Sequence, residues 1–403
     1  MNIKKKAIES TNWMSTFNLL GKAKVNDFTF KINEKSQKSD WIYNTMNIGI
    51  DCGEKYGTVF CEMMGGYGEN RNNVIYAHGK EEDGKDDFST PIIVDWDDRN
   101  NEIILKTIGD LSFITVGLEK NEKGKIFYKK FLSPYDAIAY IKECLSDDTV
   151  VNIRGNLKYS IYDGKTQVHK NITSIVLSKI DDESKFVSKF TQSILIDKDS
   201  ANLKNIDKDK GVMYVDGKVL DYLKEFNGVT LINTKGEAKG GQFPFDKQFE
   251  YKFPDLSNAE QCKKIMDKLF KVKKGITQIT FEGNFVEGGA TVKATLDDIP
   301  DDIKDLIECG VYTEEEALAR CSTNGKREQR MIIHTPVTKL VGDDENKVPV
   351  LQIFKERYSE DEIVLDYLYS SADNIEDFEE IYTPDDDDEE SNDDDDLDWL
   401  DKL

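Results

Sequence analysis

Short runs of alternating apolar and polar residues dominate residues 25–180. The runs 41–50 and 58–63 each place aliphatic side chains on one parity, and residues 51–57 between them are rich in turn-forming types. Because successive side chains of a strand point to opposite faces, we expect two strands joined as a hairpin. The aromatic residues on the parity opposite the aliphatic side chains are Trp41, Tyr43 and Phe60. Further strands are expected at 91–96, 102–107 and 111–118.

A helix is expected to begin at Ser133. Serine at the N-cap, Pro134 at the first helical position and Asp136 at the third are strong start signals. Two strands are expected after this helix, at 149–160 and 169–180. Strands, one helix and then two more strands is the order of a five-stranded OB barrel, whose helix lies between the third and fourth strands.

The same order of elements recurs in the second half of the chain. The segment 151–157 aligns with 279–285 at an offset of 128 residues, and apolar positions of the preceding helices keep the same offset. We therefore predict an internal duplication. The expected elements of this half are strands at 190–197, 211–220, 228–233 and 242–253, a helix at 258–270, and strands at 276–285 and 330–341.

These elements predict a mainly β (α+β) fold of two OB-like β-barrels with inserted helices. The second copy differs by a predicted helical hairpin at 299–325, in the position of the loop between strands four and five. A disordered acidic C-terminal tail completes the prediction. The expected divisions are an N-terminal arm 1–20, a first OB-like domain 21–182, a second 183–370 and the tail 371–403.

The tail changes how the overall charge is interpreted. The chain of 403 residues has a net charge of −24, and residues 371–403 hold seventeen acids against one lysine. The remainder is near neutral and can carry local basic surfaces. Such an acidic run cannot build a core and is typical of a disordered segment. Its tip is nevertheless apolar, which predicts docking to a partner protein or to the protein's own cationic groove. The apolar tip residues are Leu397, Trp399, Leu400 and Leu403.

Composition favours a cytoplasmic protein without cofactors. No signal peptide or membrane-spanning run is recognisable, and six cysteines without a Cys-x-x-Cys pair are expected to be reduced thiols. Cys52, Cys61 and His78 could be drawn as metal ligands, but their spacing fits no zinc pattern. The alternative interpretation of the two cysteines is small buried apolar side chains.

Enzymatic motifs are missing, so we expect a protein that is not an enzyme. The sequence has no phosphate-binding loop, nucleophile elbow or His-Glu-x-x-His motif. Three histidines (His78, His169 and His334) lie in strand-like patterns and are expected to be satisfied rather than catalytic. The acids around Trp96 could be drawn as a metal site, but a solvated turn is the better interpretation.

Binding signals are stronger. Non-specific binding of single strands requires cations along a groove and aromatic faces for the bases. On the first copy the candidates are Trp41, Tyr43, Tyr56, Phe60, Tyr67, Arg71, Tyr76 and Lys80, together with Arg154, Lys158, Tyr159, Tyr162 and Lys165 around the hairpin between strands four and five. On the second copy the candidates are Lys235, Lys239, Lys326, Arg327 and Arg330.

Two alternatives concern the aromatic residues. Trp41 and Phe60 could instead pack against the inserted segment 81–130. In the second copy, five aromatic residues of one parity are expected to form core rather than a stacking surface. These residues are Phe243, Phe245, Phe249, Tyr251 and Phe253.

Tandem OB-like domains and an aspartate run ending in an apolar tip resemble single-stranded DNA-binding proteins of the phage or bacterial replication type. This resemblance implies barrels that coat single-stranded DNA during viral DNA replication, recombination and repair, and a tail that recruits replication proteins. The ending Trp399-Leu400-Asp401-Lys402-Leu403 departs from the bacterial Pro-Phe tip. The segment 299–330 resembles helical hairpins of phage replication-module proteins.

Two other classes of function remain open at this point. One is a structural or assembly protein of a virus particle, in which an acidic arm acts as a tether. The other is an acidic regulator that mimics DNA and blocks a nucleic-acid enzyme. Salt-dependent binding to oligonucleotides distinguishes the first class from a coating protein, and deletion of the tail distinguishes the second.

Overall fold

The computed structural model describes residues 7–81, 83–180, 182–288, 291–292, 304, 307, 313–314, 323–324, 328–342 and 347–365. The described fold is mainly β, as the sequence predicts. The elements of the first half are β1 (Ser15–Lys24), β2 (Phe30–Lys35), β3 (Trp41–Asp51), β4 (Thr58–Gly68), β5 (Val74–Lys80), β6 (Asp86–Asp95), η1 (Trp96–Asp98), α1 (Glu102–Leu105), η2 (Asp110–Ser112), β7 (Ile114–Lys120), β8 (Ile126–Phe131), α2 (Pro134–Cys144), β9 (Val150–Tyr162) and β10 (Lys165–Leu177).

The second half has a similar succession. Its elements are η3 (Glu183–Lys185), β11 (Val187–Ile196), β12 (Ala201–Asp207), β13 (Val212–Leu223), β14 (Glu225–Phe226), β15 (Val229–Thr230), β16 (Gly241–Lys252), α3 (Ala259–Ile265), η4 (Met266–Phe270), β17 (Ile276–Gly288), β18 (Thr291–Val292), β19 (Thr323–Asn324), β20 (Glu328–Pro336), β21 (Thr338–Val341), β22 (Val348–Leu351), β23 (Ile353–Tyr358) and α6 (Glu360–Val364).

Five strands of the first half pair in a closed cycle, which we call ring one. β1 pairs antiparallel with β3, β3 with β4, β10 with β9, and β9 again with β1. The cycle closes through a short parallel contact between β4 and β10 at Glu62 and Asn171. Helix α2 lies between the third and fourth strands of the cycle in the chain, with Ser133 capping it by accepting a hydrogen bond from Tyr135 N.

Ring two repeats this order with the strands β11, β13, β16, β17 and β20. The antiparallel pairs are β11–β13, β13–β16, β17–β20 and β11–β17, and β16 meets β20 in parallel at Glu250 and Ile332. Helix α3 again lies between the third and fourth strands of the cycle. The second half therefore has the same strand order as the first.

The register of the strands repeats as well. Gly155 of ring one lies opposite Phe17, and Gly283 of ring two lies opposite Phe190. A Cβ at Gly155 would lie 2.7 Å from the Phe17 ring, and one at Gly283 would lie 2.4 Å from the Phe190 ring. The register also shifts beside each glycine, between β9 and β10 and between β17 and β20. The two glycines keep the predicted offset of 128 residues, whereas the two phenylalanines are 173 residues apart, and the repeated arrangement agrees with the predicted internal duplication.

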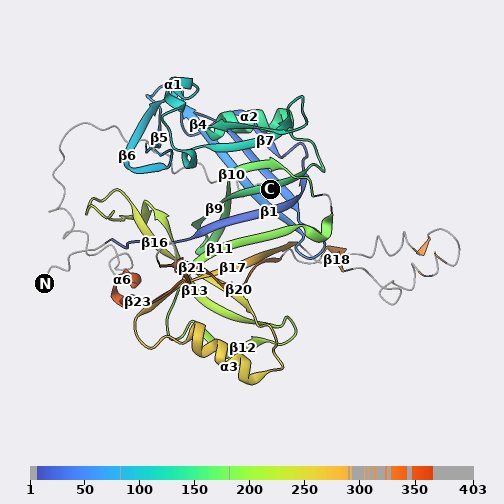
Figure 1. Ribbon diagram of the computed structural model, residues 1–403, viewed down its shortest axis with the longest axis vertical. Coiled ribbons are helices and arrows are strands. Elements are labelled where there is room, and N and C mark those ends of the chain that lie inside the picture. Colours follow the sequence, from blue (N-terminus) through green and yellow to red (C-terminus); the bar gives the residue numbers. More distant parts are fainter. Residues whose placement is uncertain are drawn as a thin grey trace.

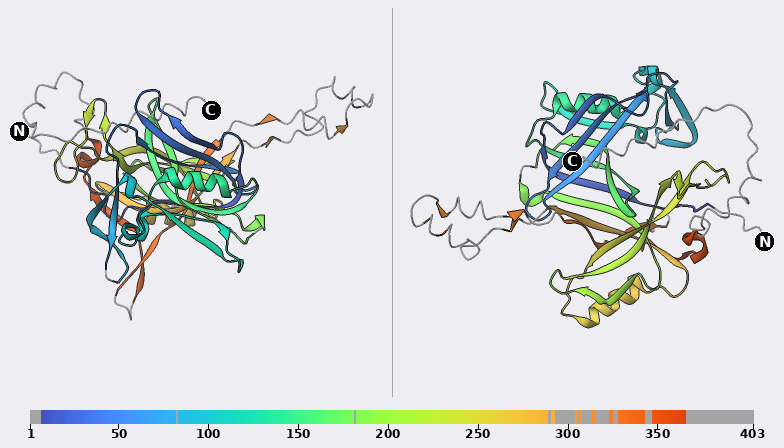
Figure 2. Two further views of the ribbon diagram at one scale, coloured as in Figure 1. Left: turned by 90° about the horizontal axis from the view of Figure 1, so that it is seen from above. Right: turned by 180° about the vertical axis from the view of Figure 1, so that it is seen from behind.

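The two rings share one sheet because β1 and β11 pair with each other. Phe17 and Phe190, which hold equivalent positions, are direct partners in this antiparallel pair. A sheet of fifteen strands results. Figure 1 shows β9, β1, β11 and β17 following one another across the middle of the molecule, with α2 and α3 at opposite ends. The view from behind shows the same order (Figure 2).

One buried apolar cluster runs through both rings. It includes Ile48, Ile153 and Phe190, and the five aromatic residues expected as core in the second copy are all buried in it. A smaller cluster lies under the β5–β6 hairpin.

Three sequence-based expectations need correction. Strand β1 begins at Ser15, inside the segment predicted as an N-terminal arm, and the alternation of Phe17 and Leu19 continues only through the small residues Gly21 and Ala23. Residues 102–107 were expected as a strand but contain the short helix α1, whose cap Asn101 accepts a hydrogen bond from Ile103 N. In the stretch 228–233 only Val229–Thr230 are strand. The hairpin predicted at 299–325 lies almost entirely outside the described residues.

Candidate nucleic-acid interface

The outward face of β3 and β4 carries the aromatic residues predicted for it. Trp41 and Tyr43 stack on each other with ring centroids 4.7 Å apart and an angle of 17° between the planes. Phe60 is 39% exposed and lies opposite Gly49, eight residues along β3 from Trp41. At roughly 3.3 Å per residue, the aromatic groups are about 26 Å apart on one face. Neither Trp41 nor Phe60 belongs to the apolar cores of the described residues.

A cavity of about 350 Å³ opens beside Trp41, and we call it the aromatic pocket. Gly66 lies in its wall, where a Cβ would be 2.2 Å from the carbonyl oxygen of Ile42, so glycine is required. Tyr76, at the edge of the pocket, is 72% exposed. The lining residues are Trp41, Gly65, Gly66, Arg71, Asn72, Asn73, Val74, Ile75, Tyr76, Trp96, Leu132, Ser133 and Pro134.

Trp96 was missed as a site residue because the acids around it favour a solvated turn. The turn is present as η1, but the indole packs 5.1 Å from the Tyr67 ring and beneath the Arg99 guanidinium, 4.2 Å from its centroid. Arg99 Nε in turn donates to Asp136 Oδ2 at 2.7 Å. Asp136 lies in the first turn of α2, so the helix start that the sequence predicts also positions one wall of the pocket. The signal available in the sequence was the arginine three residues after the tryptophan.

Four of the predicted cations are already paired with carboxylates. Such pairs are poorer phosphate contacts, because an incoming phosphate must compete with a fixed carboxylate. In Arg330, predicted as a phosphate contact after the hairpin insertion, the guanidinium Nε lies 2.9 Å from both carboxylate oxygens of Glu250. The other pairs are Arg71 with Asp40 at 3.4 Å, Lys158 with Asp221 at 3.1 Å, and Lys80 with Asp110 at 2.5 Å.

Tyr159 is not available to a ligand. It is 4% exposed, its hydroxyl donates to Gln192 Oε1 at 2.9 Å, and its ring packs against Phe245. Burial raises the pKa of this phenol. Tyr159 therefore joins the two rings instead of stacking a base, which corrects the prediction.

The remaining candidates are spread over loops. Tyr162 and Lys165 flank the exposed turn between β9 and β10, and Tyr56 lies under the Lys55 ammonium at 4.8 Å. Lys235 and Lys239 are exposed in the loop before β16. Lys326, Arg327 and the tail residues Leu397, Trp399, Leu400 and Leu403 lie outside the described residues.

A second cavity, of about 300 Å³, lies between the β9–β10 hairpin of ring one and β13 of ring two. His169 is in its wall, with Nδ1 2.8 Å from Glu62 Oε1 and Nε2 2.7 Å from Ser160 Oγ. This is the donor and acceptor order of a Ser-His-acid triad. Ser160 lies in the regular β9–β10 ladder, opposite Gln167, rather than on a sharp turn.

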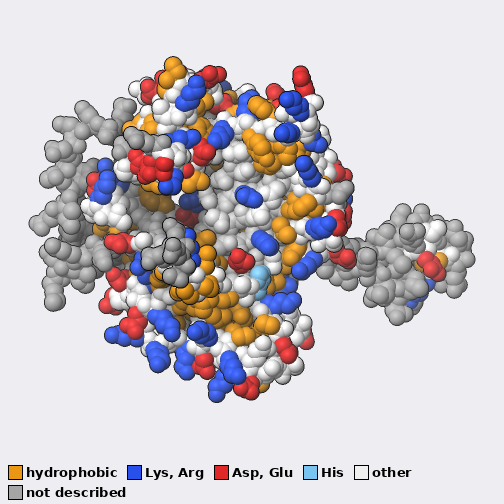
Figure 3. Space-filling view, in the orientation of Figure 1, with side chains coloured by type: hydrophobic (Ala, Val, Ile, Leu, Met, Phe, Trp, Pro, Cys, Tyr) orange, Lys and Arg blue, Asp and Glu red, His pale blue; other side chains and the backbone are white. Residues whose placement is uncertain are grey.

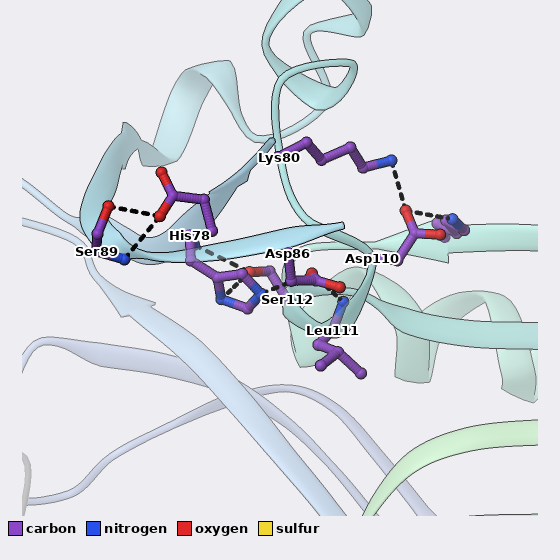
Figure 4. Close-up of polar contacts among 9 residues, drawn as sticks. His78, Lys80, Asp86, Ser89, Asp110, Leu111 and Ser112 are labelled. Carbon is purple, nitrogen blue, oxygen red and sulfur yellow. Dashed lines mark hydrogen bonds and ion pairs between the residues drawn. The ribbon is translucent and has the colours of Figure 1, made fainter. Parts of the chain in front are cut away.

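His78 makes a similar set of hydrogen bonds at the β5–β6 hairpin. Its Nε2 lies 2.8 Å from Asp86 Oδ1 and its Nδ1 lies 2.9 Å from Ser112 Oγ, and Asp86 also accepts from Leu111 N (Figure 4). The ring stacks on Phe88 with centroids 4.4 Å apart. These hydrogen bonds join the β5–β6 hairpin to the η2 turn.

His334 of β20 completes the set, with Nε2 3.1 Å from Asn284 Oδ1 and Nδ1 2.8 Å from Thr335 Oγ1. All three histidines thus have partners at both ring nitrogens, as expected of satisfied side chains. Cys52 and Cys61 are buried in the core, and burial raises the pKa of each thiol. They are placed as the small apolar residues of the alternative interpretation, away from His78.

Comparisons with known proteins give limited information. Residues 75–274, just under half of the chain, match the family described as YorF. No curated protein matches the chain. Among solved structures, the chain is similar to a deletion mutant of the single-stranded DNA binding protein from Thermus aquaticus, with 8% identity over 68% of this chain and 87% of that chain and a TM-score of 0.28.

Within the part of the chain that the structure describes, no helix is both long enough and apolar enough to span a membrane.

Proposed function

We propose that this protein binds and coats single-stranded DNA without strong sequence preference, and that its two rings are OB-like barrels. The proposal extends to viral DNA replication and recombination in a host cytoplasm, with the acidic tail recruiting replication proteins. The strand order of each ring, with a parallel contact between the third and fifth strands and a helix before the fourth, supports OB-like barrels.

The observation that carries the proposal is the aromatic outward face of ring one. Trp41 and Tyr43 stack on the strand pair that forms the ligand surface of OB folds, beside a cavity of about 350 Å³. A stacked base contributes about 1–3 kcal/mol whatever its identity, because every base has an aromatic face. Such a surface favours single strands, whose bases are free to stack, over duplex DNA.

The equivalent strands of ring two have a more polar outward face, although it includes Tyr222, which is 52% exposed. On β13 and β16 the outward residues Lys218 and Asp246 form an ion pair, and Gln248 donates to Asp216 at 2.8 Å. We therefore propose that ring one makes the base contacts.

We propose a binding role rather than a catalytic one. The Ser160–His169–Glu62 contacts have the order of a hydrolase triad, but an acyl-transfer site also needs N–H donors aimed at the developing oxyanion. The backbone around Ser160 is engaged in the β9–β10 ladder, which favours a structural network.

A fluorescence titration with oligo-dT at low and high salt tests the proposal, using the tryptophans at the aromatic pocket as reporters. We expect quenching by single strands, weaker binding to duplex of the same length, and affinity that falls as salt rises because bound phosphates release counterions. Equal affinity for duplex and single strand, or affinity that is independent of salt, would contradict the proposal.

A further inference from the structure

A row of polar side chains crosses the junction of the two rings. Asn18 of β1 lies opposite Arg154 of β9 on one side and opposite Lys189 of β11 on the other. Lys189 in turn lies opposite Asn284 of β17. Asn284 then bonds His334 of β20. Directly opposite residues of paired strands project to the same face of a sheet, so these five side chains form one line, which we call the junction row.

The cations at the junction row have no carboxylate partner. Arg154 and Lys189 are exposed, and so are Lys55 and Lys252 nearby; within the described residues none of the four forms an ion pair. This is the reverse of Arg71, Lys158 and Arg330, whose charges are already neutralised. In Figure 3 the middle of the molecule is mostly neutral, with separate Lys and Arg side chains standing on it.

The charged groups around His334 indicate the electrostatic environment at one end of the junction row. Burial lowers its pKa, and the charges of Lys189, Lys55 and Lys252 lower it further, while Glu282 opposes them. Three cations therefore converge on this histidine and one acid faces it. Cations therefore outnumber acids among the charged groups near this end of the row, which favours the approach of an anion.

We propose that the junction row is a phosphate-binding track along which the backbone of a single strand passes from ring one to ring two. The inference rests on the proposed function and deepens it, since it adds a surface that the aromatic face of ring one does not contain. Arg154 and Lys189 supply the charge. The amide of Asn18 lies between them and accepts from Asn152 Nδ2, and that of Asn284 lies beyond Lys189 and donates to Ser188 O.

The composition of the row indicates which part of the nucleic acid it contacts. Apart from the imidazole of His334, the row contains no aromatic side chain to stack a base, whereas phosphates and sugars accept hydrogen bonds from arginine, lysine and asparagine. Arg154 and Lys189 are two strands apart, or about 10 Å at the usual strand spacing, which suits separate phosphates of an extended strand. The row therefore positions the strand, and the aromatic face of ring one stacks its bases.

The test compares Arg154→Gln/Lys189→Gln with a control, Lys123→Gln/Lys208→Gln, which removes two charges from exposed turns outside the row. Both variants and the parent are titrated with thymidine oligomers of about 6 and about 30 nucleotides, lengths that cover part of one barrel or both. For the long oligomer we expect the row variant to lower the salt slope by about 1.4, at about 0.7 per phosphate contact. If the row variant and the parent bind equally well at 1 M salt, the variant should therefore bind about 25-fold more weakly than the parent at 0.1 M salt.

The control variant and all titrations with the short oligomer should match the parent. If the parent binds no oligomer, the proposed function fails; if the parent binds and the row variant keeps its salt slope, only the junction row is wrong. A synthetic peptide of residues 384–403 tests the other anion available. Loss of peptide binding without loss of DNA binding in the row variant would assign the row to the acidic tail and overturn the inference.

Discussion

At the scale of single residues, the proposed contact of ring one with a base rests on the stacked pair Trp41 and Tyr43. Each indole or phenol face that is half exposed can accept one base, and a stack of two extends the surface without further ordering of the chain. The pair therefore gives the most direct test of base contact.

We predict that Trp41→Ala weakens binding of oligo-dT by about 1–3 kcal/mol and leaves the salt slope unchanged, because the indole neutralises no phosphate. Phe127→Ala is the matched control, since Phe127 is an exposed aromatic residue of β8 away from this face. Fluorescence anisotropy of a labelled oligomer measures both. An unchanged affinity of Trp41→Ala would show that the base path avoids the aromatic pocket.

Residue parity explains one correct and one wrong prediction. Trp41 and Tyr43 were placed outward by alternation, and they line the outward face. Tyr159 was taken as a contact residue although it shares parity with the buried Ile153 and Leu157, so the sequence already contained the evidence that it is buried. The partners of the cations could not be predicted in this way, because Lys158 and Asp221 are far apart in the chain and meet only when the rings pack.

At the scale of elements, the glycine of the fourth strand holds the same packing position in each ring. Gly155 and Gly283 each face the ring of a phenylalanine on the first strand and a carbonyl oxygen of the fifth strand. Only a residue without a Cβ allows this close approach, which accounts for a glycine at both positions.

We predict that Gly155→Ala and Gly283→Ala each lower the free energy of unfolding by about 1–3 kcal/mol through overpacking. Gly79→Ala is the control, because the nearest atom to its Cβ would be 3.5 Å away, an ordinary contact. Urea unfolding followed by circular dichroism measures the three variants. Equal stability of all three would mean that a Cβ is tolerated at both glycines and that the overpacking argument is wrong.

The elements that the sequence did not predict share a physical cause. Strand β1 is weakly apolar on its inner face beyond Leu19, yet it pairs with β3, β9 and β11 and so belongs to both rings. Its place is determined by long-range pairing, which a local pattern does not report. The run at 102–107 is too short for apolar residues to distinguish a helix from a strand, and the Asn101 cap decides in favour of α1.

At the scale of the whole molecule, a buried ion pair holds the rings together. Lys170 of β10 and Glu287 of β17 are 6% and 2% exposed, with Nζ and Oε1 2.5 Å apart. Glu287 also accepts a hydrogen bond from Phe60 N at 3.3 Å, and its own N–H donates to the carbonyl oxygen of Tyr56. The pair thus links the β4 end of the proposed DNA face to ring two.

We predict that Lys170→Met lowers the free energy of unfolding by about 3–5 kcal/mol, because it leaves the carboxylate of Glu287 buried without its partner. The double variant Lys170→Met/Glu287→Leu should recover most of the loss, since replacing both charges leaves none unpaired. Urea unfolding measures both variants. If Lys170→Met is as stable as the parent, the ion pair between Lys170 and Glu287 does not determine how the rings associate.

We expect the distribution of charge over the whole chain to set the acidic tail in competition with DNA for the junction row. The tail carries the same sign of charge as DNA, and the junction row carries the opposite sign without internal partners. Removing residues 384–403 should therefore raise the affinity for oligo-dT most at low salt, where screening is weakest. Trp399→Ala should leave DNA binding near that of the parent but abolish binding of a replication partner, because aspartates steer approach while the indole supplies apolar burial. Titration of the truncated protein at several salt concentrations and a pull-down with Trp399→Ala measure the two effects. Affinity unchanged by truncation at every salt concentration would exclude competition for the DNA surface, and partner binding retained by Trp399→Ala would exclude the apolar tip as the docking group.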